Sequence, residues 1–190
     1  FDGYDYATSM IENARAGGLA QSAANVRFAQ RDIMDGLPGR FDLVYTTRCL
    51  INLPSWDMQV AALRHIHAGL ADGGTYLMVE NFQEGHDNFN AVRRAYGLAE
   101  IAVRPHNFFF QRPRLIDFMA PLFALREELN ISSTYYLTSR VIYARICADR
   151  GEAPDYFDDH HRLAAGLPFA GEFGPVRLLV FEKKAPEAGR

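Results

Sequence analysis

Side chains that can bind a polar ligand or move a proton lie at two points in residues 41–81, each just after an apolar run. The first run leads into residues 45–49, which include two threonines, an arginine and a cysteine, and the second leads into Glu80 and Asn81. A helix expected from about Ser55 connects the runs, with Val60, Leu63, Ile66 and Leu70 on one face. This order of elements predicts a strand–helix–strand unit in a parallel sheet. Ligands of such sheets collect at the carboxyl ends of the strands. We therefore expect these side chains to line a ligand-binding edge.

Two more strands are expected before this unit, at residues 1–5 and 26–29. The helix between them begins with the capping-box spacing of Ser9 and Glu12 and ends at Gly17-Gly18. This order of elements predicts a doubly wound, Rossmann-like α/β fold. Because the sequence begins with Phe inside an expected strand, we interpret residues 1–190 as one domain that is incomplete at its N-terminus.

The pattern changes after Asn81, where short helices surround an aromatic run. A long helix is expected over residues 134–150, capped by Ser132 or Ser133, and a final strand over residues 176–182. We expect this last strand to run antiparallel in a mostly parallel sheet. Residues 82–175 are interpreted as including a helical, substrate-binding or lid insertion.

Composition narrows the class of protein. The net charge of −3 does not suggest a general nucleic-acid-binding surface, and no apolar run approaches the 18 residues of a membrane span. Neither a nucleic acid nor a membrane is therefore expected as a partner. Cys49 and Cys147 lie far apart without a CxxC pair, which favours a reducing, cytoplasmic location over a disulfide framework or a zinc site.

Four segments resemble class I S-adenosylmethionine-dependent methyltransferases: FDGYDYATSMIENAR, RDI, FDLVYTTRCLINL and LADGGTYLMVEN. They resemble the parts of that family around its second to fifth strands. The resemblance covers residues 1–81 and resumes at the final strand, whereas residues 82–175 are only loosely covered. The family's Gly-rich loop, which wraps the methionine part of the cofactor, precedes the region that this sequence covers.

The resemblance implies S-adenosylmethionine as cofactor and S-adenosylhomocysteine as product. Asp5 would accept hydrogen bonds from the ribose hydroxyls, and Asp32 with the Ile33 N–H would bind adenine. Taken together, the implied cofactor-binding residues are Asp5, Tyr6, Met10, Asp32, Ile33, Thr46, Thr47 and Arg48. Two alternatives stay open: Asp5 is also a common turn-capping residue, and Met10 is nearly as compatible with core packing.

Methyl transfer depends mainly on alignment of donor and acceptor, and a base is needed only when the acceptor must lose a proton. Glu80, after the second strand of the opening unit, and His106, in the aromatic run, are the candidate catalytic bases. For each there is a structural alternative: Glu80 as a cap or backbone ligand, and His106 as an exposed or packed loop residue.

Arg48, Tyr135, Tyr136 and Arg140 are the candidate acceptor-binding residues, because arginines and tyrosine hydroxyls suit a phosphate or carboxylate. Helix packing and surface ion pairs are their structural alternative. The run from Asp158 to His161 has metal-ligand chemistry, but neighbouring residues on a helix point in different directions, so no metal site is expected.

These features predict a methyltransferase that acts on a small polar or anionic molecule, methylated on oxygen, with a homodimer left open. Two other functions stay open: a noncatalytic Rossmann-like binding module, and an NAD(P)-dependent nucleotide-sugar oxidoreductase, whose fold also places an acid after the second strand.

Overall fold

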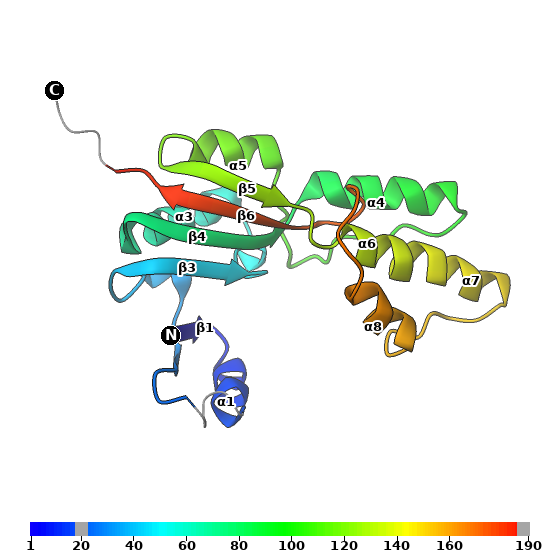
Figure 1. Ribbon diagram of the computed structural model, residues 1–190, viewed down its shortest axis with the longest axis horizontal. Coiled ribbons are helices and arrows are strands. Elements are labelled where there is room, and N and C mark those ends of the chain that lie inside the picture. The colour runs from blue at the N-terminus through cyan, green and yellow to red at the C-terminus, as the bar shows by residue number, and fades with distance from the viewer. Residues whose placement is uncertain (18–22, 186–190) are drawn as a thin grey trace.

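The computed structural model describes residues 1–17 and 23–185 and contains two sheets with helices around them (Figure 1). Gly18, part of the expected helix stop, lies outside these residues. The strands are β1 (Asp2–Asp5), β2 (Arg27–Gln30), β3 (Phe41–Thr47), β4 (Leu70–Asn81), β5 (Phe123–Leu129) and β6 (Val176–Lys183). The α-helices are α1 (Thr8–Ala16), α3 (Trp56–Gly69), α4 (Gln83–Ala95), α5 (Arg112–Met119), α6 (Ser133–Tyr136), α7 (Tyr143–Asp149) and α8 (Asp159–Ala165). Two 3₁₀ helices, η1 (Ile33–Asp35) and η2 (Leu50–Asn52), and one π-helix, η3 (Leu137–Ile142), complete the order.

The larger sheet has the strand order β3-β4-β6-β5, and the smaller one pairs β1 with β2. β3 and β4 are parallel, as are β1 and β2, whereas β6 runs antiparallel to both of its neighbours. The predicted α/β architecture with an antiparallel final strand is therefore confirmed. The single continuous sheet is not observed: no described strand joins β1 to β3, and the Phe1 ring instead stacks on Tyr45 with centroids 6.1 Å apart.

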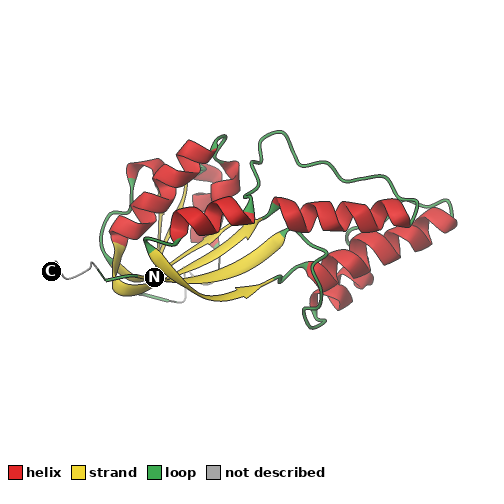
Figure 2. Cartoon of the chain, turned by 90° about the horizontal axis from the view of Figure 1, so that it is seen from above, coloured by secondary structure: helices red, strands yellow, loops and turns green. Residues whose placement is uncertain are grey.

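The hydrophobic core lies on one face of the larger sheet, where Figure 2 shows helices gathered on one side of the strands. Leu63 and Ile66 of α3 are fully buried against this face, as predicted from their helical spacing, together with Tyr76 and Met78 of β4. On the opposite face Tyr45 remains 50% exposed. Strand alternation explains the difference, because successive side chains point to opposite faces.

A second group of helices forms a helical lobe at one end of the larger sheet, built from α4, α6, η3, α7 and α8 (Figure 1). The expected long helix is present as the continuous run α6–η3–α7, but its middle is π-helical. There the hydroxyls of Thr138 and Ser139 donate to the carbonyls of Thr134 and Tyr135, four residues back. Such bonds compete with the backbone ladder and distort helices.

The expected helix start near Ser55 is confirmed, whereas the caps expected at two other helix starts are not observed. Ser55 caps α3 by accepting the Met58 N–H. At α1 the expected capping box of Ser9 and Glu12 is absent, because the helix begins two residues earlier, after Ala7. At α6 neither serine caps the helix with its side chain; the Ser132 hydroxyl instead bonds the backbone of Val176.

Within residues 1–17 and 23–185, no helix is both long enough and apolar enough to span a membrane.

Candidate cofactor and acceptor site

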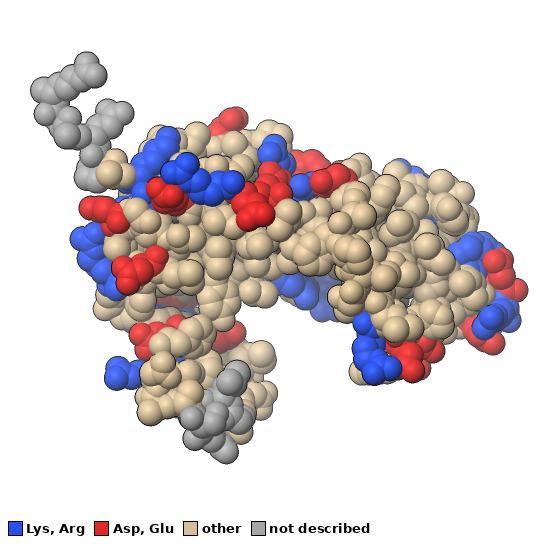
Figure 3. All heavy atoms as spheres, in the orientation of Figure 1, with Lys and Arg blue, Asp and Glu red and all other residues tan. Residues whose placement is uncertain are grey.

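The carboxyl ends of β1, β2 and β3 bring three predicted site residues to one edge of the molecule. Asp5 ends β1, Asp32 follows β2, and Arg48 follows β3. Figure 3 shows that the surface is hollowed between the part formed by β1 and α1 and the helical lobe. β1 and β3 point toward this hollow in Figure 1, and ligands of parallel α/β sheets collect at such carboxyl ends.

Electrostatics show that the two sheets meet at this edge. Partial burial, followed by the negative charges of Glu80, Asp5 and Asp32, raises the pKa of the Cys49 thiol well above its ordinary value. The Cys49 residue retains an exposed side, so it lies at the surface of the edge and not in the core. Negative charges from both sheets thus act on the Cys49 side chain.

Asp5 and Asp32 each anchor the turn that follows them. Asp5 Oδ1 accepts the Ala7 N–H at 2.7 Å, and Asp32 Oδ1 accepts the Met34 N–H at 2.9 Å and so caps η1. The capping role that the sequence left open for Asp5 is thus present. It engages one oxygen of each carboxylate, and a carboxylate has a second oxygen with which to accept ligand donors.

Tyr6 and Met10 present apolar surface to solvent beside Asp5. Their side chains are 73% and 54% exposed. Core packing, the alternative for Met10, is therefore not what the structure shows. Ile33, which follows Asp32, is half-buried and packs against the core.

Arg48 has a left-handed backbone conformation, with φ of 49°, alone among the described residues other than glycine. Its N–H donates to the Val79 carbonyl at 2.8 Å, and its carbonyl accepts from the Asn52 amide at 2.8 Å. Such a conformation is unfavourable for a side chain with a Cβ and is often found at functional sites. The preceding threonines diverge: Thr47 is exposed at the edge, whereas Thr46 is buried, with its hydroxyl 2.8 Å from the Tyr76 hydroxyl.

Glu80 is fully buried, which corrects its expected place on the rim. Oε1 accepts the N–H groups of Cys49 and Leu50, both at 3.1 Å, and Oε2 accepts the Ile51 N–H at 3.3 Å. Burial raises the pKa of Glu80 to about 7, although these backbone bonds and the Thr46 hydroxyl act in the opposite direction. The carboxylate therefore fastens η2 to β4, and it cannot reach a ligand at the edge without releasing these bonds.

His106 is exposed on a segment that lies against η2. Asn107 bonds the Asn52 side chain at 2.9 Å, and the Phe108 N–H donates to the Ile51 carbonyl at 2.7 Å. The Phe108 carbonyl accepts from the Gln59 amide at 2.8 Å. These bonds hold Asn107 and Phe108, the residues that follow His106, against η2 and α3. Within the described residues, no hydrogen bond of the His106 imidazole itself is observed.

The predicted acceptor residues of the helical lobe are only partly brought together. Burial raises the pKa of Tyr136, while the positive charges of Arg48 and Arg140 lower it, which places both arginines near that hydroxyl. Tyr135 turns away: its hydroxyl lies 3.1 Å from His161 Nδ1. The Arg140 guanidinium lies 3.9 Å from the centroid of the Tyr156 ring. The charges of Arg48 and Arg140 thus both act on the Tyr136 hydroxyl, whereas Tyr135 belongs to a neighbouring aromatic cluster with His161.

The structure shows side-chain environments for His161 and Asn81 that the sequence did not predict. His161 is buried and pairs with Tyr135, a contact that no spacing in the sequence indicates. Asn81 is buried at the end of β4 with an unpartnered side-chain oxygen. Its position after an apolar run marked it as a rim residue, but its burial could not be read from the sequence.

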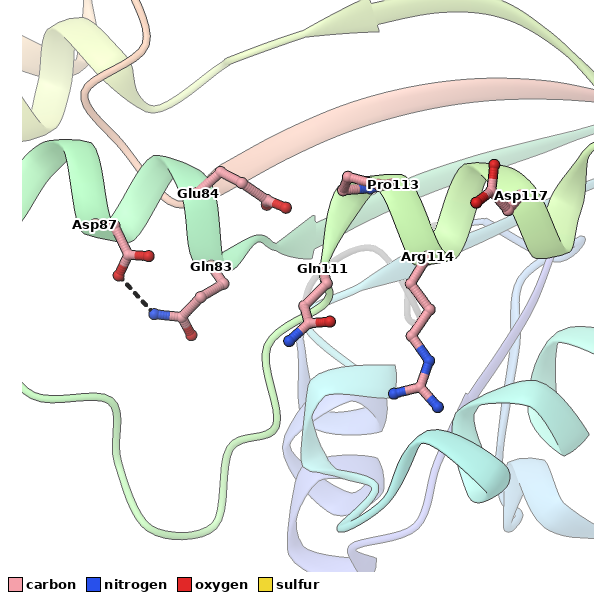
Figure 4. A pocket seen from close by; sticks show the side chains of 7 residues that line it. All are labelled: Gln83, Glu84, Asp87, Gln111, Pro113, Arg114 and Asp117. Carbon is pink, nitrogen blue, oxygen red and sulfur yellow. Dashed lines mark hydrogen bonds between the residues drawn. The ribbon is translucent and has the colours of Figure 1, made fainter.

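A separate hollow of about 490 Å³ lies between the first turns of α4 and α5 (Figure 4). Its lining consists of Gln83, Glu84, Asp87, Gln111, Pro113, Arg114 and Asp117. Arg114 packs over the Trp56 ring at 4.4 Å, and Glu84 accepts the Arg112 N–H that begins α5. None of the predicted site residues lines this hollow. In the part of the chain that the structure describes, no three His, Cys, Asp or Glu side chains gather as a metal site.

No protein-family model and no curated protein matches the sequence. Solved structures do match the fold. The N-methyltransferase NodS from Bradyrhizobium japonicum WM9, in complex with S-adenosyl-L-homocysteine, is 13% identical, with a TM-score of 0.54 over 96% of this chain and 65% of its own. Magnesium protoporphyrin IX methyltransferase (ChlM) from Synechocystis PCC 6803, with the same molecule bound, is 12% identical, with a TM-score of 0.58 over 96% and 64%.

The mitomycin 7-O-methyltransferase MmcR is 12% identical, with a TM-score of 0.54 over 96% of this chain and 41% of its own. The chain thus spans about two thirds of the length of NodS and ChlM, and less of MmcR. TM-scores above 0.5 over nearly all of this chain show that the fold is shared. The chain therefore has the Rossmann-like α/β fold of class I S-adenosylmethionine-dependent methyltransferases.

Proposed function

We propose that this chain is the core of an S-adenosylmethionine-dependent methyltransferase that methylates a small polar or anionic acceptor on oxygen. The observation that carries the proposal is the convergence of Asp5, Asp32 and Arg48 on one carboxyl-end edge. The solved structures of NodS and ChlM, which share the fold, are complexes with S-adenosylhomocysteine.

The residues at the edge fit this cofactor. S-adenosylmethionine supplies a methyl group on a positively charged sulfur and leaves as S-adenosylhomocysteine. Asp5 would accept the ribose hydroxyls and Asp32 the adenine amino group, with the Ile33 N–H beside it and the exposed Tyr6 and Met10 as apolar cover. The negative charges that act on Cys49 suit a cationic ligand.

The acceptor would lie between this edge and the helical lobe. Arg48 and Arg140 near Tyr136 provide two positive charges and a hydroxyl, which together suit a phosphate or carboxylate. In this proposal residues 130–175 with α4 act as the substrate-binding part of the insertion. Residues in the same insertion, α5 and β5, belong instead to the sheet layers.

Of the two candidate bases, His106 is the one whose side chain is exposed and so could accept a proton from a bound molecule. Its segment is tethered to η2 through Asn107 and Phe108, and its side chain is exposed. Glu80 is assigned a structural role, because all three of its backbone bonds would have to break before it could accept an acceptor proton.

A transfer assay tests the proposed function. Full-length protein is incubated with methyl-labelled S-adenosylmethionine and a mixture of sugar phosphates and small hydroxy acids, and label in the small-molecule fraction is measured. Label incorporation supports the proposal, and incorporation only into RNA or protein refutes the small acceptor. A parallel titration with NADH separates the oxidoreductase alternative, since binding of NADH in place of S-adenosylmethionine would overturn the methyltransferase.

A further inference from the structure

Asn81 is a buried polar residue whose side-chain oxygen lacks a hydrogen-bond partner. Its residue is 4% exposed, and Oδ1 receives no hydrogen bond within the described part of the chain. Its backbone carbonyl accepts the Phe110 N–H at 3.0 Å, and the residue pairs with Val176 across β4 and β6. Leaving a buried acceptor unpaired is unfavourable, so such a group in a folded protein calls for a cause.

The fold satisfies the other buried asparagines. Asn90 Oδ1 accepts the Ile101 N–H at 3.0 Å, and its Nδ2 donates to the Ile101 carbonyl at 3.1 Å. Asn130 donates to the Gly174 carbonyl at 2.9 Å and accepts the Ser132 N–H at 3.3 Å. Both hold loops in place, whereas the Asn81 amide fastens nothing through its oxygen.

The position of Asn81 is that of a ligand-binding residue. It is the last residue of β4, at the carboxyl end of a parallel pair. Strand alternation places its side chain on the face shared by Thr47 and Val79, which are register partners, and opposite the face of Glu80. Arg48 is bonded to Val79, two residues before Asn81, so the amide lies on the β4 side of the same edge.

We propose that Asn81 binds the methyl acceptor, with Oδ1 accepting a hydrogen bond from a hydroxyl or amino group of that molecule. A carbonyl oxygen only accepts, so the ligand must provide the donor. Together with the arginines near Tyr136, this defines an acceptor that carries an anionic group and a hydrogen-bond donor, such as a hydroxy acid or a hydroxylated phosphate. The inference rests on the proposed function and adds the contact that selects the acceptor.

The test compares the same substitution at an unpartnered and at a fully bonded asparagine. Leu is close to Asn in shape but has no polar atoms, so Asn81→Leu removes the unsatisfied oxygen, whereas Asn90→Leu breaks its bonds to Ile101. We expect the urea midpoint of Asn81→Leu to equal or exceed that of the wild type, and the midpoint of Asn90→Leu to fall. Asn81→Ala serves the same purpose if the larger side chain prevents folding.

Function is measured in the full-length proteins with methyl-labelled S-adenosylmethionine and the mixture of sugar phosphates and small hydroxy acids. We expect both Asn81 variants to bind S-adenosylmethionine as the wild type does but to lose on the order of tenfold or more in methyl transfer, the effect of one hydrogen bond. Wild-type transfer by the Asn81 variants, or destabilisation of Asn81→Leu equal to that of Asn90→Leu, overturns the inference. An inactive wild type instead refutes the proposed function, and this inference falls with it.

Discussion

Substitution of Glu80 separates a structural carboxylate from a catalytic one. The side chain is fully buried and accepts three N–H groups, from Cys49, Leu50 and Ile51. Glu80→Ala leaves these donors without their partner, and at about 1 kcal/mol or more each we expect a loss of roughly 3 to 5 kcal/mol in the free energy of unfolding. Glu80→Gln keeps the two bonds at Oε1 but places an NH₂ group near the Ile51 N–H, so we expect a smaller loss of about 1 to 2 kcal/mol.

The pH dependence provides a second, independent readout. Because burial raises the folded-state pKa of Glu80 to about 7, above the ordinary 4.5, the folded protein holds the proton more tightly than the unfolded chain. Its contribution to stability is therefore fully present below pH 4.5 and is lost as pH rises through 7. The total change is about 3 kcal/mol, from about 1.4 kcal/mol for each unit of pKa shift. Gln does not titrate, so Glu80→Gln should gain about 3 kcal/mol relative to the wild type over this range, which turns its small disadvantage at low pH into an advantage at high pH.

Urea unfolding of the wild type, Glu80→Ala, Glu80→Gln and the control Glu127→Gln at pH 5 and pH 8 measures both effects. Glu127 is exposed on β5, so its variant should unfold like the wild type. A Glu80→Gln protein that keeps wild-type stability at both pH values but loses methyl transfer would refute the reasoning, because it would make Glu80 a free base at the edge.

Two further predictions concern the same edge. Arg48 has φ of 49°, a conformation that glycine adopts without the Cβ penalty, so Arg48→Gly should be more stable than Arg48→Ala by about 1 kcal/mol. Both variants should lose acceptor binding. Equal urea midpoints of the two variants would contradict the predicted difference in stability. The raised pKa of Cys49 predicts slow alkylation by iodoacetamide at pH 7, because the thiolate is the nucleophile, and Asp32→Asn should speed the reaction. Mass spectrometry measures the rate of alkylation. A rate for Cys49 equal to that of a free thiol would show that the neighbouring carboxylates do not act on it.

The sequence correctly predicted the helix and strands whose formation depends on residues close together in the chain. The spacing of Leu63 and Ile66 predicted the buried face of α3, and its start near Ser55 was also predicted. The two short apolar runs correctly predicted β3 and β4. β4 extends from Leu70 to Asn81 and so includes residues on both sides of its apolar run. These features are determined by residues close in the chain.

Features that depend on distant residues were not predicted. A glutamate after a strand has the same sequence signal whether it faces solvent or caps η2, and only the fold shows that Glu80 meets residues about thirty positions earlier. The pairing of Tyr135 with His161 spans 26 residues and two helices. The π-helical turns around Ser139 arise from side-chain bonds that hydrophobic periodicity does not register.

Binding of S-adenosylmethionine by the full-length protein, measured by isothermal titration, tests the central claim most directly. The matched variants are Asp5→Asn and Asp32→Asn, because Asn keeps the Oδ1 that accepts the Ala7 and Met34 N–H groups and removes only the charge. We predict one site in the wild type, affinity lowered on the order of tenfold to a hundredfold in each variant, and no change in Glu127→Gln. Absence of binding by the wild type, or wild-type affinity in both aspartate variants, would contradict the account.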